Sequence, residues 1–168
     1  MILAGLVLGN LLLLLICFDV NYFLASESLC LIGLVLGLSI TRINATLNNL
    51  DQSYLLFLDH IIAASGSYSA MNGLSNFSSY LSGRCCLGLG DAKLAAIGGA
   101  WIGTQGIFVE PEVAFISGGL FSLIGRILFL LRPQQAFPFV PFIASVIWSV
   151  WVFGNNWWIQ QLDRVLGI

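Results

Sequence analysis

Long apolar stretches are the feature that most constrains how this chain can fold. Residues 2–18 contain no charged side chain, and residues 113–131 contain a single one. A helix that crosses a bilayer needs about 20 mostly apolar residues, because backbone groups cannot be left unpaired in hydrocarbon. Of all residues 58% are hydrophobic and 8% are charged, whereas soluble domains carry about 25% charged residues. The sequence therefore predicts an all-α, polytopic membrane helical bundle.

The 168 residues leave room for about six transmembrane helices in a single membrane-embedded domain, residues 1–168. The expected spans are 2–18, 29–40, 57–80, 92–109, 113–131 and 137–158, and a start of the second span nearer Tyr22 stays open. A polar loop at 41–54, a glycine-rich turn at 83–90, a tight connection at Glu110-Pro111-Glu112 and a break at Arg132-Pro133 separate them. Tryptophans at 157 and 158 are expected at the closing interface.

Charge and cysteine content exclude several classes of function. The net charge is −2 and no basic run occurs, so nucleic acid is not an expected partner. The four cysteines form no C-x-x-C pair, so neither a metal nor another cofactor is expected. Cys17 and Cys30 lie in apolar stretches and are expected to be free, buried thiols.

Small and polar residues recur at helical spacing. Glycine pairs four residues apart occur at 5–9, 33–37 and 99–103, a spacing that lets helices approach closely in lipid. On the third span a polar stripe is expected to face protein or water. Either hydrogen bonds between helices or a wet cavity would explain it. Its members are Ser65, Ser69, Asn72, Asn76 and Ser79.

Two aspartates lie where spans meet polar stretches, Asp19 after the first span and Asp91 before the fourth. Counting spans places both at the same face of the membrane. Two neighbouring carboxylates do not both ionise cheaply, so one proton is shared. One carboxylate can then act as a base on water while the other, as an acid, polarises a carbonyl. This pairing predicts the chemistry of an aspartic protease.

The residues around Asp91 form a longer pattern. The segment Gly88-Leu89-Gly90-Asp91-Ala92-Lys93-Leu94, followed by Gly99-Ala100-Trp101-Ile102-Gly103, resembles the signature of type IV prepilin peptidases in the G-x-G-D class of intramembrane aspartic proteases. Cys17-Phe18-Asp19 stands where that family carries its first catalytic aspartate. Phe137-Pro138-Phe139-Val140-Pro141-Phe142 is similar to the family's P-F-G-P-F box. The similarity covers nearly the whole chain, in order.

The resemblance implies an endopeptidase that removes short leaders from type IV prepilin-like precursors at the cytoplasmic face of the inner membrane. Asp19 and Asp91 would be catalytic, Gly88, Gly90 and Lys93 would belong to the active-site loop, and Pro138 and Pro141 would bind substrate. Glycines beside Asp91 would permit unusual backbone shapes and a close approach of substrate. The precursor and the lipid bilayer are the implied partners.

The chain also departs from the family pattern. Leu24-Ala25-Ser26 stands where the family usually has Pro-Asp or Pro-Asn, and Val140 replaces a glycine of the box. The N-terminal part of larger members, which carries paired C-x-x-C motifs and methylates the product, has no counterpart in these residues. The resemblance is therefore to a short form, expected to cleave without methylating.

Other functions stay open. One is a catalytically inactive scaffold for pilus or secretion assembly. Another is a small transporter that couples to protons through Asp59 and His60, although this pair also suits the far end of the third span. Lys93 could hold Asp91 ionised, contact the substrate or extend to the interface as a structural lysine. A precursor-cleavage assay separates the protease from the alternatives.

The distribution of basic residues predicts the orientation in the membrane. Arg84, Lys93 and Arg132 fall at the face of the two aspartates, and Arg42 and Arg164 fall opposite. Because cytoplasmic loops carry an excess of lysine and arginine, the face with the aspartates is expected to be cytoplasmic.

Overall fold

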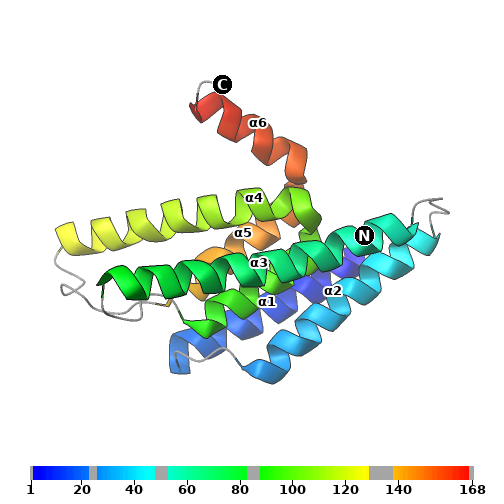
Figure 1. Cartoon of the computed structure of the whole chain (residues 1–168), viewed down its shortest axis with the longest axis horizontal. Coiled ribbons are helices and arrows are strands. Elements are labelled where there is room, and N and C mark those ends of the chain that lie inside the picture. Colours follow the sequence, from blue (N-terminus) through cyan, green and yellow to red (C-terminus); the bar gives the residue numbers. More distant parts are fainter. Residues whose placement is uncertain (1, 23–25, 48–52, 83–87, 129–137, 167–168) are drawn as a thin grey trace.

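The computed structural model describes residues 2–22, 26–47, 53–82, 88–128 and 138–166, and in these residues every regular element is an α-helix (Figure 1). The prediction of an all-α fold is confirmed. The six helices are α1 (Ile2–Tyr22), α2 (Glu27–Leu47), α3 (Ser53–Ser82), α4 (Leu89–Ile127), α5 (Val140–Phe153) and α6 (Asn155–Leu166).

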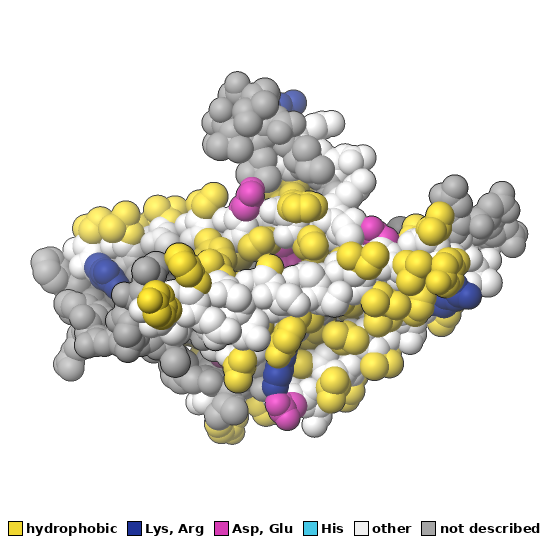
Figure 2. Space-filling model, viewed as in Figure 1, with side chains coloured by type: hydrophobic (Ala, Val, Ile, Leu, Met, Phe, Trp, Pro, Cys, Tyr) yellow, Lys and Arg dark blue, Asp and Glu magenta, His cyan; other side chains and the backbone are white. Residues whose placement is uncertain are grey.

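The surface and the helix lengths confirm a membrane bundle. Within the described residues, α1, α2 and α4 are long and apolar enough to cross a bilayer, and α5 is a shorter apolar helix. Large hydrophobic side chains point outward over the bundle (Figure 2), among them Leu3, Leu31 and Ile116. A protein surrounded by water would not leave so much apolar surface exposed.

The largest correction concerns α4, which runs through Glu110-Pro111-Glu112, so the predicted tight connection there is wrong. The chain turns instead at Gly103, whose φ of 71° and ψ of −176° interrupt the helix. Gly98 packs against the Glu110 carboxylate, although a straight helix would hold these residues about 18 Å apart. The helix therefore doubles back into a first arm (residues 89–102) and a second arm (residues 104–127), as Figure 1 shows.

Other helix boundaries also differ from the expected spans. The helix α1 continues past Asp19 to Tyr22, and α2 continues through much of the expected polar loop to Leu47. The last span ends at Phe153 rather than Trp158, because Gly154 adopts a φ of 83°. Trp158 belongs to α6, a separate polar–apolar helix that projects from the bundle in Figure 1. The expected break at 132–133 lies outside the described residues.

Glycine pairs seat tryptophan rings between the helices. A Cβ at Gly37 would lie 2.6 Å from the Trp101 indole, whose Nε1 donates to the Gly33 carbonyl oxygen at 3.0 Å. On α1, Gly5 is similarly covered by Trp151 of α5. These contacts support the predicted packing role of the glycine pairs and join α1 to α5 and α2 to α4.

At Gly99 the backbones of α3 and α4 come so close that a Cβ would lie 2.6 Å from the Ala63 carbonyl. The polar stripe on α3 turns partly back on its own helix: the Ser65 hydroxyl donates to the Ile61 carbonyl and the Ser69 hydroxyl to the Ser65 carbonyl. Among the described residues these two hydroxyls donate within α3, so bonds between helices, one of the two explanations considered, do not account for them.

The order of the helices along the chain determines which helix ends lie at the same end of the bundle. In Figure 1, α1 ends, α4 begins and α5 begins at one end of the bundle, and the start of α1 and the end of α2 lie toward the other. Residues from three separate parts of the sequence therefore gather at the first end, called here the active end.

Candidate active site

Asp19 lies in the last turn of α1 and is buried, with 8% of its surface exposed. Its carboxylate faces the backbone N–H of Val140, the first residue of α5. The N-terminus of a helix favours a negative charge because its N–H groups and dipole point toward it. The Asp19 Oδ2 atom has no hydrogen-bond partner among the described residues, which is uncommon for a buried polar atom.

The proline box determines where α5 begins. Pro138 precedes the helix, Phe139 is its N-cap residue and Pro141 lies in its first turn, where proline sacrifices no helical hydrogen bond. Phe139 packs against Phe115 of α4, with ring centroids 5.3 Å apart. The proline box therefore determines that the N-terminus of α5 lies beside Asp19. Contact of Pro138 and Pro141 with substrate stays a prediction.

Asp91 lies in the first turn of α4 and accepts the Gly88 N–H through Oδ2 at 3.1 Å. This bond satisfies one of the free N–H groups at the start of the helix. Gly88 has an extended backbone, with φ −79° and ψ 152°, which any residue can adopt. Gly88 therefore does not use the unusual backbone shapes that glycine would permit. Gly90 lies in the same first turn, one residue before Asp91.

The two aspartates lie at the active end on different helices, close enough for their charges to interact. Their surroundings differ, because Asp19 faces the N-terminus of α5 whereas Asp91 lies in the first turn of its own helix. Both therefore sit where helix N-termini favour negative charge. Such a pair of carboxylates can hold and exchange a proton with a water or a polarised carbonyl.

Lys93 makes an ion pair with Glu27, the first residue of α2. This contact between α4 and α2 differs from the three roles considered for Lys93, and a contact of Lys93 with substrate stays a prediction. Sequence analysis did not single out Glu27, which lies 66 residues from Lys93 along the chain. An acidic residue in the first turn of a helix is common, so nothing in the sequence pointed to this partner.

Asp59 and His60 lie at the turn of α4. Asp59 accepts the Thr104 backbone N–H at 3.1 Å and the Thr104 hydroxyl at 2.5 Å. His60 donates from Nδ1 to the Ala100 carbonyl oxygen at 3.0 Å. The two side chains thus satisfy backbone groups on both arms, which lipid could not do. The pair was expected at the far end of the third span. In the structure both residues lie within α3 and not at its end.

Two further predictions concern cysteines and metals. Cys17 and Cys30 are free, as predicted, but Cys17 is exposed rather than buried. In the part of the chain that the structure describes, no three His, Cys, Asp or Glu side chains gather into a metal-binding group.

The comparisons with known proteins agree with these features. The model of the type IV leader peptidase family matches residues 6–153. The chain belongs to the type IV leader peptidase family. The match includes Asp19, Asp91 and the start of α5, so the whole candidate site lies inside the family region.

Three curated relatives are named prepilin leader peptidase/N-methyltransferase. The protein of Neisseria gonorrhoeae is 27% identical over 96% of this chain and 54% of its own length. Those of Pectobacterium carotovorum subsp. carotovorum and Legionella pneumophila are 32% and 29% identical, over 84% and 86% of this chain and 48% and 49% of their own lengths. The chain thus spans about half the length of these relatives. No solved structure matches this chain.

Proposed function

We propose that this chain is an intramembrane aspartic endopeptidase that removes the leader from type IV prepilin-like precursors. Its position would be the inner membrane, with the active end at the cytoplasmic face. The observation that supports this proposal best is the pairing of Asp19 and Asp91 at one end of the bundle, in a chain of the type IV leader peptidase family.

The proposed reaction needs one proton shared by two carboxylates. The ionised carboxylate takes a proton from a water molecule, which attacks the scissile carbonyl carbon, and the protonated carboxyl donates its proton to the carbonyl oxygen. The tetrahedral intermediate then collapses: one of its hydroxyl groups returns a proton to the carboxylate that had acted as the acid, the C–N bond breaks, and the leaving nitrogen takes up the proton that the base removed from water. The free Asp19 Oδ2 supports a contact with this water.

Replacing each aspartate by asparagine tests the pair, because asparagine keeps the size of the side chain but cannot ionise. Asp19→Asn and Asp91→Asn should each slow cleavage of a precursor by at least about 10²–10⁴-fold, the usual contribution of general acid–base catalysis. The double variant should be scarcely slower than either single variant, since residues that act as a unit fail together.

The assay is cleavage of one purified precursor in liposomes, with equal amounts of folded variant. The control is Glu112→Gln, a change of an exposed carboxylate on the second arm of α4, which should leave the rate unchanged. A fully active Asp19→Asn or Asp91→Asn enzyme would refute the proposed pair.

A further inference from the structure

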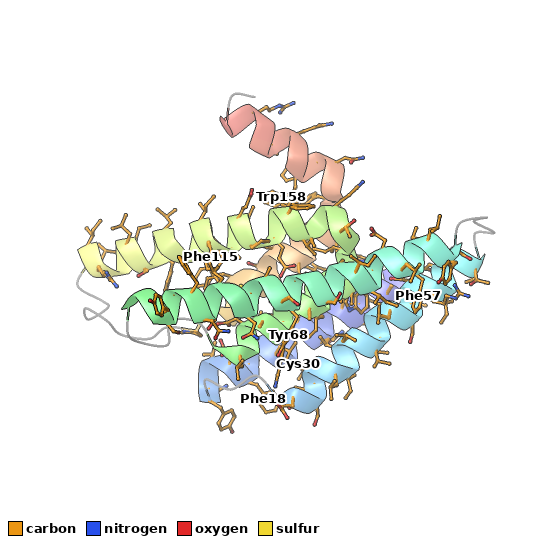
Figure 3. The ribbon with its side chains drawn as sticks, viewed as in Figure 1. Phe18, Cys30, Phe57, Tyr68, Phe115 and Trp158 are labelled. Carbon is orange, nitrogen blue, oxygen red and sulfur yellow. The ribbon has the colours of Figure 1, made fainter. Side chains whose placement is uncertain are left out.

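An apolar groove lies on the outside of the bundle between α2, α3 and the first arm of α4. Its volume is about 510 Å³. Figure 3 labels Tyr68 and Cys30, which line the groove from α3 and α2. Leu31 and Ile61 also line it and remain 64% and 36% exposed. The groove is therefore open toward the surrounding lipid.

A pair of opposite charges lies at one end of the groove. Lys93, near the start of α4, makes an ion pair with Glu27, the first residue of α2, and both side chains line the groove. Glu27 is 80% exposed and Lys93 is 29% exposed, so a ligand can reach both charges. Tyr68 lies near enough to interact electrostatically with Lys93. This end of the groove therefore combines a cation, an anion and a phenol hydroxyl.

The groove is separate from the candidate active site. The described residues that line it include neither Asp19 nor Asp91. Lys93 follows Asp91 by two residues, which places the two side chains about 200° apart around a helix of 3.6 residues per turn. The groove therefore lies on another side of the first arm of α4 than Asp91.

The length of the groove corresponds to one leaflet of a bilayer. From Glu27 to Leu38 the α2 wall extends about 16 Å, at 1.5 Å per residue, which is half of a hydrocarbon core about 30 Å thick. The described lining residues end at Leu38 and Ile61, although α2 continues to Leu47 and α3 begins at Ser53. A helix of this length and about 10–12 Å wide would occupy roughly 1,300–1,800 Å³, far more than the groove holds. An acyl chain is much thinner and fits.

We propose that the groove binds one phospholipid, with an acyl chain between α2 and α3 and a headgroup that carries both a phosphate and an ammonium at the ion pair. The Lys93 ammonium donates to the phosphate, and the Glu27 carboxylate accepts from the headgroup ammonium. An ethanolamine headgroup fits best. A choline headgroup has no N–H to donate to Glu27, and the phosphate of a glycerol headgroup has no positive charge beside it to offset Glu27.

The headgroup, rather than the acyl chain, determines which lipid binds. Lipid tails are as apolar as leucine, so burying a tail between helices gives little preference over the surrounding bilayer. The two charges at the end of the groove are the feature that distinguishes one phospholipid from another. The site is therefore expected to select among headgroups when the acyl chains are the same.

Native mass spectrometry measures which phospholipid stays on the protein. The purified chain is mixed in a mild detergent with equal amounts of three palmitoyl-oleoyl phospholipids, which carry ethanolamine, choline or glycerol headgroups. The ethanolamine lipid should be bound about 2–5-fold more than either of the others, the range that an exposed ion pair contributes. Equal binding of the three lipids, or a preference for another headgroup, would overturn the assignment.

Two changes from glutamate to glutamine test the ion pair. Glu27→Gln removes the negative charge beside Lys93, so it should abolish the preference for ethanolamine and favour the glycerol lipid, because an available cation attracts an anionic headgroup. Glu112→Gln removes an exposed carboxylate on the second arm of α4 and should keep the preference for ethanolamine. Unchanged selectivity in Glu27→Gln, or the same loss in both variants, would contradict the role of the pair.

Two adjacent isoleucines on α3 test the position of the acyl chain. Ile61 lines the groove, whereas Ile62 is 60% exposed and is not among the described residues that line it. Ile61→Trp should lower the amount of bound ethanolamine lipid several-fold, and Ile62→Trp should leave it unchanged, at equal helix content by circular dichroism. Equal lipid binding by the two variants would overturn the assignment. A dimer of the native chain that only Ile61→Trp dissociates would assign the groove to a second copy and overturn it as well.

Discussion

At the scale of single residues, Asp59 and His60 are neighbours on α3 that serve opposite arms of α4. Asp59 accepts from the first amide of the second arm, at Thr104, and His60 donates to Ala100 near the end of the first. A turn inside a membrane bundle leaves free N–H and C=O groups on both arms, and each unsatisfied group is unfavourable in lipid. Gly103 allows the backbone to turn, and the bonds of Asp59 and His60 stabilise that turn.

Replacing Asp59 should separate this structural role from a catalytic one. Asp59→Ala leaves the Thr104 amide unpaired and should lower the free energy of unfolding by about 0.5–2 kcal/mol, the usual effect of losing a helix cap. Asp59→Asn keeps an acceptor oxygen and should retain most of the stability and the cleavage activity. Thermal unfolding in detergent and precursor cleavage measure the two effects. A folded but inactive Asp59→Asn variant would favour the proton-coupled alternative.

The sequence identified some residues of the site and missed others for physical reasons. Asp19 and Asp91 could be singled out because counting spans places both at one face of the membrane and because Asp91 lies in the G-x-G-D-x-K-L pattern. Glu27 and Glu110 could not, since the significance of each depends on a neighbour on another segment. Glu27 pairs with Lys93, and Glu110 is buried against Gly98 only because the chain doubles back.

At the scale of helices, α2 and α4 are joined by an indole ring that fills the space above two glycines. Trp101 leaves no room for a side chain at Gly37 and donates its N–H to the Gly33 carbonyl. The ring thus combines close packing with a hydrogen bond to a backbone group.

Adding one methyl group at Gly37 should disturb this contact. A Cβ there would lie 2.6 Å from the indole, so Gly37→Ala should lower the free energy of unfolding by about 1–3 kcal/mol, as overpacking usually does. Gly73→Ala is the matched control on α3, where a Cβ meets nothing within 4 Å. That change should raise stability by about 0.5–1 kcal/mol, because alanine favours the helix. Equal melting temperatures for the two variants would contradict the close packing of Trp101 against Gly37.

The apolar stretches predicted where the helices lie, but they did not predict the turn inside α4. Glu110-Pro111-Glu112 suggested a break because proline disfavours a helix interior, yet membrane helices tolerate proline when neighbours satisfy the freed groups. The actual turn needs a positive φ at Gly103 and two capping side chains on α3. Local sequence shows the glycine but not the partners 40 residues or more away.

At the scale of the whole molecule, the active end carries a basic residue that was not included when the basic residues at the two faces of the membrane were compared. Arg126 lies in the last turn of α4, at the end where α1 finishes and Lys93 lies. At the opposite end, Arg42 lies over the ring of Phe57, with 5.6 Å between the guanidinium carbon and the ring centroid. Figure 3 labels Phe57 far from Phe18, which belongs to the active end.

The orientation of the bundle can be tested with two positions on α2. Ser28 lies near the active end and Thr46 near the other, both exposed and about 27 Å apart along the helix. The positive-inside rule predicts that the active end is cytoplasmic. In a variant without the native cysteines, an impermeant thiol reagent should label Thr46→Cys in intact cells and Ser28→Cys only after the membrane is opened. The cysteine-free parent is the control for background. Labelling of Ser28→Cys alone in intact cells would place Asp19 and Asp91 outside and exclude cleavage at the cytoplasmic face.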